Sequence, residues 1–205
     1  TFALHEENYG NLTDMSFTSP IILSGCSKTI SPVLTITNAP TFLTQGATSG
    51  TVTVKFTVPQ NQYACTYTGN IVLNGKYASP VHYELPLTIT VNQAPILNIV
   101  KKTDITPTQN GSIEVRNDGN VDLVGVALTR SSGDFEVEFS KSLFDLAAGT
   151  KETVTVSPID LGVISFGGKS VTITAETGSL TKTLVMGVPG SFCKSGEVGG
   201  MLEIN

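Results

Sequence analysis

The sequence predicts an all-β protein built from antiparallel β-sandwiches. Apolar and polar residues alternate with a period of two along most of the chain, whereas a 3.6-residue apolar period is almost absent. The alternating segments are rich in Val, Ile and Thr, which suit a pleated, half-buried surface. Gly, Pro, Asn and Asp interrupt them at intervals of about ten residues, a spacing typical of sandwiches.

The first half of the chain is expected to form one sandwich over residues 1–93. A strand is expected within SFTSPIILSG, which ends just before Cys26. Four further segments alternate cleanly, and each is bounded by turn residues. They are VLTITN (33–38), TVTVKFTV (51–58), YTGNIVL (67–73) and LTITV (87–91).

A second sandwich is expected over residues 94–188. The strand that ends at Val91 meets Asn-Gln-Ala-Pro, which places the boundary near 93–95. The alternating segments here are SIEVRN (112–117), VGVALT (124–129), ETVTVS (152–157) and SVTITAE (170–176). Residues 140–149 are expected to be an irregular connection rather than a helical turn. Residues 189–205 are expected to be a linker or the first strand of a further domain.

The composition predicts a secreted protein with enough apolar residues to form a buried hydrophobic core. Hydrophobic residues make up 40% of the chain, and no run of 18 apolar residues is present, so no membrane span is expected. Charged residues make up only 14%, against about 25% in typical globular chains. Thr, Ser, Asn and Gly take their place, as in many secreted all-β proteins.

The charge distribution excludes an electrostatic nucleic-acid binder. The net charge is −5, and the 12 basic residues are spread thinly. The densest basic site, Lys101-Lys102, is too small to hold a phosphate backbone. Anionic membrane surfaces are disfavoured for the same reason.

Cys26 and Cys65 are expected to form a disulfide within the first half. Secretion favours the oxidised pair, and a loop of this length gives about 4 kcal/mol in the chain-entropy model. The alternative is a pair of reduced core cysteines.

Cys193 then has no partner within the chain. A bond to a cysteine in a later segment is the first expectation, and a bridge to another subunit or a free thiol are alternatives. A catalytic cysteine requires a nearby base, and the two histidines, His5 and His82, lie in the other half.

An oxygen-rich turn around residues 118–122 is a candidate calcium site. Asp118, Asn120 and Asp122 stand at alternate positions, as at the start of a calcium-binding loop. The sixth position is Leu123, where a helix–loop–helix site requires glycine. The alternative is a plain turn in which Gly119 supplies a positive φ angle. No other cofactor is expected.

No constellation in the sequence predicts catalysis. Asp134, Glu136 and Glu138 fall on one face of a strand, so they do not straddle a scissile bond. The simpler interpretation is a solvated face over a packed one.

Two acceptor sequons make Asn11 and Asn110 candidate N-glycosylation sites, at Asn-Leu-Thr and Asn-Gly-Ser. Both lie in turn-like settings. In a secreted archaeal or eukaryotic chain they would carry covalent glycans.

The second half resembles the Ig-like repeats of prokaryotic cell-surface proteins, including the CARDB-like and α-galactosidase-associated families. The similar features are an N-x-G-N-x-x-L-x-x-V core (Asn117, Gly119, Asn120, Leu123, Val126) and an L-x-A-G-x-x-x-x-V-x-V pair (Leu146, Ala148, Gly149, Val154, Val156). In the first half, ACTYTGNIVLNG and YELPLTITV resemble the last two strands of such a repeat. The ending FCKSGEVGGMLEIN is similar to repeat junctions in S-layer proteins of archaea. The resemblance implies two tandem Ig-like antiparallel β-sandwich domains in an extracellular scaffold without catalytic residues.

The function expected is that of a structural or adhesive surface protein that associates with neighbouring subunits in a layer or filament. Either terminal segment, TFAL or GMLEIN, is a candidate strand donated to a neighbour. An accessory binding module of a secreted hydrolase or adhesin is the alternative, and an enzyme in its own right is a third.

Overall fold

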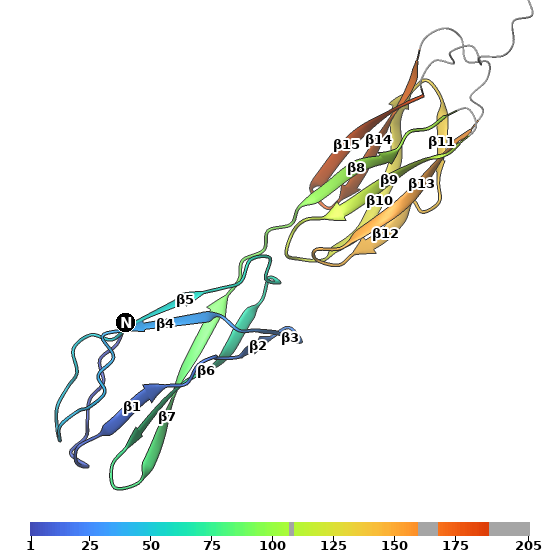
Figure 1. Cartoon of the computed structure of the whole chain (residues 1–205). Coiled ribbons are helices and arrows are strands. Elements are labelled where there is room, and N and C mark those ends of the chain that lie inside the picture. Colours follow the sequence, from blue (N-terminus) through green and yellow to red (C-terminus); the bar gives the residue numbers. More distant parts are fainter. Residues whose placement is uncertain (107–108, 160–167, 189–205) are drawn as a thin grey trace, which may run out of the picture. The chain divides into compact units, whose positions relative to one another are not determined.

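The computed structural model describes residues 1–106, 109–159 and 168–188, and it confirms the all-β class (Figure 1). Its strands form antiparallel sheets throughout. Contacts between Cα atoms divide the chain into two compact units, Thr1–Gln93 and Ala94–Asn205. The division falls at the Asn-Gln-Ala-Pro break in the sequence.

Unit 2 is a sandwich of two four-stranded sheets. One sheet has the strand order β12 (Leu143–Leu146), β10 (Leu123–Gly133), β14 (Lys169–Thr177), β15 (Leu180–Val188). The other has the order β11 (Glu136–Phe139), β13 (Lys151–Ile159), β9 (Gly111–Asn117), β8 (Leu97–Thr103).

One continuous apolar core fills the space between these sheets. Alternation along each strand sends every second side chain inward, as the period-two pattern predicts. Ile113 and Val154 pair across β9 and β13 and are fully buried, and Val126 and Ile173 reach the same core from the other sheet.

Residues 140–149 correct one sequence-based expectation, because they include strand β12 rather than only an irregular connection. Phe144 and Leu146 are buried, and they pair with Val126 and Leu123 of β10. Two inward apolar residues at two-residue spacing, next to an available sheet edge, are enough for a short strand.

Gly119 also differs from expectation, since it is not among the residues with positive φ. Glycine is needed at this position because the backbone of residues 94–96 passes very close to it. A β-carbon at this position would collide with the carbonyl oxygen of Ala94 and the backbone nitrogen of Ile96. Glycine at 119 therefore lets the turn after β9 lie against the segment that enters unit 2.

Unit 1 is built around strand β6 (Thr66–Lys76). Along one side, β6 pairs with the whole length of β7 (Pro80–Thr90). Its other side is shared by β1 (Thr13–Phe17) and β2 (Leu23–Gly25), and β3 (Lys28–Ile30) pairs with β2. A separate two-stranded ribbon is formed by β4 (Val33–Thr37) and β5 (Thr53–Thr57).

The buried core of unit 1 contains two small clusters and no cluster as large as that of unit 2 among the described residues. One contains Leu12, Met15, Leu43 and Leu73, and the other contains Leu23, Ile30 and Tyr67. Small separate clusters bury less apolar surface than one continuous core. Unit 1 therefore depends more than unit 2 on individual polar and covalent links.

The N-terminal segment TFAL lies within its own unit. Phe2 exchanges two backbone hydrogen bonds with Val52, with N···O distances of 3.1 and 2.8 Å. The carbonyl of Leu4 accepts a hydrogen bond from the N–H of Ser49 at 2.8 Å. In this structure TFAL is a bound segment of its own chain rather than a free strand.

Replacing Ile173 with alanine is expected to lower the free energy of unfolding of unit 2 by about 2–5 kcal/mol, because it leaves a cavity in a fully buried site. The matched control is Ile159→Ala in β13, where the side chain is 45% exposed, and a change below about 1 kcal/mol is expected. Urea denaturation followed by circular dichroism measures both. Equal effects would contradict the described core.

Candidate functional site

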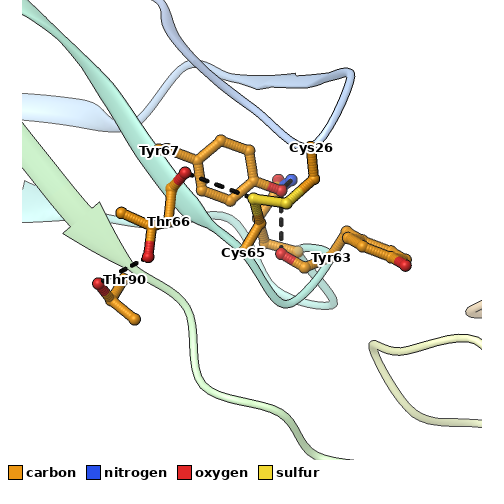
Figure 2. The surroundings of a disulfide bond; sticks show 7 residues. Cys26, Tyr63, Cys65, Thr66, Tyr67 and Thr90 are labelled. Atoms are coloured by element: carbon orange, nitrogen blue, oxygen red, sulfur yellow. Dashed lines mark hydrogen bonds between the residues drawn. A yellow bond between two sulfur atoms is a disulfide. The ribbon is translucent and has the colours of Figure 1, made fainter.

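The disulfide between Cys26 and Cys65 ties the β2–β3 turn to the start of β6 (Figure 2). Cys26 and Ser27 both have positive φ, at 49° and 56°, so the turn that presents Cys26 is tightly wound. The bond forms within unit 1, as the sequence predicts.

Tyr67 lies beside the disulfide and anchors this end of unit 1 (Figure 2). Its side chain is fully buried, yet its hydroxyl is satisfied. The hydroxyl donates to the carbonyl of Tyr63 at 2.9 Å and accepts from Nε2 of Gln62 at 2.9 Å. These bonds tie the loop before β6 to the sheet.

A buried carboxylate, Glu6, organises the opposite end of unit 1. It accepts hydrogen bonds from the backbone N–H groups of Asn8 (3.0 Å), Tyr9 (2.7 Å) and Gly46 (2.5 Å). Burial acts to raise the pKa of Glu6, but these bonds and one from Tyr77 outweigh it, so the pKa lies below its usual value. Glu6 thereby ties the N-terminal segment to the loop at Gly46.

Tyr77 extends this network to β7. Burial raises its pKa, and so do a hydrogen bond with Tyr83 and the nearby Glu6 carboxylate. Its ring also meets Tyr9 edge to face, with centroids 6.4 Å apart. Three tyrosines from separate segments therefore meet at one end of the sheet.

An apolar cavity of about 480 Å³ lies next to these tyrosines. Its floor is aliphatic and consists of Leu4, Leu12, Met15, Leu43, Leu73 and Leu85. Its rim is polar and aromatic and consists of His5, Glu7, Tyr9, Tyr77 and Tyr83. This size and lining suit a compact apolar group.

Strand β7 carries a row of apolar side chains that the unit covers only in part. Val81, Leu85, Leu87 and Ile89 are half-buried, and Tyr83 is 44% exposed. Their partners on β6 include Tyr67, Ile71 and Leu73, which are all buried. The sheet is thus covered over β6 but incompletely covered over β7.

The outer backbone edge of β7 is also open, since β7 pairs with β6 alone in the part of the chain that the structure describes. The N–H of Val91 donates to the carbonyl of Cys65, so the odd-numbered residues of β7 point their backbone groups at β6. The even-numbered residues, including His82 and Glu84, point outward. Pro86 is also even-numbered, so its lack of an N–H group removes no hydrogen bond to β6.

Unit 2 contains its own cluster of charges around Glu114 on β9, which are paired with one another. The Lys151 ammonium lies 2.8 Å from the Glu114 carboxylate, and Lys102 and Arg116 lie at 3.8 and 3.9 Å. The hydrogen bond from Lys151 lowers the pKa of Glu114 against the opposing effect of burial, and the three cations lower it further. The cluster links β8, β9 and β13 on the outer face of that sheet.

The residues of the candidate calcium turn each bind a different neighbour. Asp118 pairs with Arg116 at 3.2 Å, Asn120 accepts from the N–H of Ala94 at 2.7 Å, and Asp122 accepts from the N–H of Ala148 at 2.9 Å. Each of the three side chains thus has a protein partner, and the calcium site stays a prediction. No group of three or more His, Cys, Asp or Glu residues suited to a metal ion occurs within 1–106, 109–159 and 168–188.

The acidic segment at β11 has the alternation that the sequence predicts. Phe135 is buried, whereas Glu136 and Glu138 are exposed. Glu136 pairs with Arg130 at 3.1 Å, and Asp134 accepts a hydrogen bond from the backbone of Ser170 at 2.7 Å.

The sequon residues Asn11 and Asn110 are both exposed. Asn11 precedes β1, and its side-chain oxygen accepts a hydrogen bond from the backbone N–H of Gln45 at 3.1 Å. Asn110 directly precedes β9. Cys193 and the GMLEIN segment lie outside the described residues.

No helix long and apolar enough to cross a membrane is found among the residues that the structure describes.

Sequence reasoning missed the Glu6 network and the cavity. Nothing in the string HEENYG distinguishes Glu6 from Glu7, because the distinction comes from Gly46, forty residues away. The open edge did carry a signal. Pro86 within the alternating run YELPLTIT marks a strand with an unpaired side.

Comparison with protein-family models and with curated proteins finds no match for this chain. The resemblance to surface-protein repeats therefore stays a prediction.

Removing the disulfide is expected to destabilise unit 1 alone. The double variant Cys26→Ser/Cys65→Ser should lose about 4 kcal/mol, because the crosslink closes a loop with a sequence separation of 39. Unit 2 should unfold at an unchanged temperature. Differential scanning calorimetry measures both transitions, and a shift confined to the unit 2 transition would contradict this role.

Replacing Glu6 with glutamine is expected to lower the melting temperature of unit 1, because an amide oxygen replaces a carboxylate that accepts three backbone bonds. Folding lowers the pKa of Glu6, so its contribution is complete above the unfolded value of 4.5 and is lost as the pH falls through the folded value. The variant should therefore lose less stability than the wild type between about pH 7 and about pH 3. Thermal melts across this range test the difference, with the exposed neighbour Glu7→Gln as the control.

Proposed function

We propose that this chain is a non-catalytic extracellular structural protein, a subunit or fragment of a cell-surface layer or filament that associates with neighbouring copies through sheet edges. The observation that carries the proposal is β7. It combines an outer edge of eleven residues, unpaired among the described residues, with an adjacent apolar row that is only half covered. A strand with both properties is suited to pairing with another chain.

The disulfide and the composition support the extracellular placement. A disulfide in a domain with small core clusters is typical of proteins that fold in oxidising compartments. The low content of charged residues, 14%, also agrees with a secreted β protein. Glycans on Asn11 and Asn110 and the similarity to S-layer repeats belong to the same proposal.

A second candidate function is an accessory binding or adhesion module of a secreted hydrolase or adhesin. The cavity of about 480 Å³ favours it, since a largely apolar pocket lined also by aromatic side chains suits a small ligand. Saturable binding on a glycan or small-molecule array, without self-association, would support this candidate over the first.

The proposed function predicts concentration-dependent self-association of the intact chain. Sedimentation velocity should show species larger than a monomer that grow with concentration, and electron microscopy of the native material should show a lattice or filament. Dispersed monomers in both measurements would contradict the proposal.

A further inference from the structure

We propose that the cavity of unit 1 and the outer edge of β7 together form an acceptor site for residues 200–205 of a second copy of this chain. The inference rests on the proposed self-association. It adds which segment of one copy is the donor and which surface of the other copy is the acceptor.

The cavity and the open edge meet at Tyr83 and Leu85. Both side chains lie on the inner face of β7 and both line the cavity. A strand added outside β7 would lie about 4.8 Å away, with every second side chain on that inner face. Its inward side chains would stand next to Tyr83 and Leu85, where the cavity accepts them. Backbone pairing would then supply affinity, and the cavity would select for a large apolar side chain.

Pro86 limits the length of this added strand. The outward groups between Pro80 and Leu85 include the N–H groups of His82 and Glu84, but Pro86 has no N–H to offer. The half of β7 beside the cavity is therefore a short acceptor of about six residues.

Residues 200–205 match this acceptor in length and pattern. They read Gly-Met-Leu-Glu-Ile-Asn, so Leu202 and Ile204 share one face of an extended segment and Met201 and Glu203 share the other. The other candidate donor, TFAL, is already bound within its own unit through Phe2 and Leu4.

The path of the chain through unit 2 favours a second copy as the source. The chain enters β8 at Leu97, and β15 ends at Val188, which lies beside Asp104 just past the far end of β8. Entry and exit are thus at opposite ends of the sandwich. The eleven residues 189–199 give the donor segment a reach of at most about 38 Å from Val188. Such a head-to-tail contact uses different surfaces on the two partners, so it generates a filament when the rotation between subunits does not close and a ring when it does.

A complementation experiment on the full chain tests the proposal. The donor variant Leu202→Asp/Ile204→Asp removes the apolar face, and the acceptor variant Glu84→Pro removes an outward N–H beside the cavity. The matched controls are Met201→Asp, on the other face of the donor, and Thr88→Pro, beyond Pro86. Sedimentation velocity measures association, and thermal melts confirm folding. If Glu84→Pro unfolds, His82→Pro serves as the acceptor variant.

Each of the two variants alone should self-associate at least about tenfold more weakly than the wild type, a loss of 1.4 kcal/mol or more, and each control should behave as the wild type. An equimolar mixture of donor and acceptor variants should form dimers that grow no further, because each dimer uses its one intact donor and one intact acceptor. Association that survives in the donor variant overturns this inference and leaves the proposed function standing. A wild-type chain that stays monomeric overturns both.

Discussion

Pairing between β6 and β7 is the interaction on which unit 1 depends. Every other strand of the five-stranded sheet attaches directly or indirectly to β6, and both small core clusters contain a residue of β6, Leu73 in one and Tyr67 in the other. The hairpin thus positions the disulfide at one end and the tyrosine-rimmed cavity at the other. Since all eleven residues of β7 are committed to β6 on one side, its other side becomes the exposed edge of the sheet.

The two units are stabilised by different kinds of interaction. Unit 2 closes a continuous apolar core between two four-stranded sheets, and its charged residues pair on the outside. Unit 1 divides its core and adds specific links, namely a disulfide and a buried carboxylate held by backbone donors. A core that leaves space beside Tyr83 and Leu85 buries less apolar area, and in the proposed assembly that space would make the edge of β7 selective.

The sequence was sufficient for the fold class because alternation is a local property. Runs such as VLTITN and SIEVRN each specify a strand without reference to distant residues. β12 was missed because its four residues are too few to show a period, and they become a strand only where β10 offers an edge. The importance of glycine at position 119 was predicted, but its cause was not. The cause is the close approach of the Ala94 and Ile96 backbone rather than a positive φ angle. Most of the candidate site could not be predicted either, because it depends on contacts between residues that are distant in the sequence. Glu6 contacts Gly46, and Leu4 and Leu43 line the same cavity, only in the folded chain.

The opposite placement of the entry and exit points of unit 2 has a mechanical consequence. A pull applied through Leu97 and Val188 runs along strands β8 and β15 rather than across them. Backbone hydrogen bonds in the flanking ladders are then loaded together, so they must break at once instead of one after another. Unit 2 would therefore yield late under such a pull. In the proposed assembly, the short strand contacts between neighbours would yield first, and they could form again.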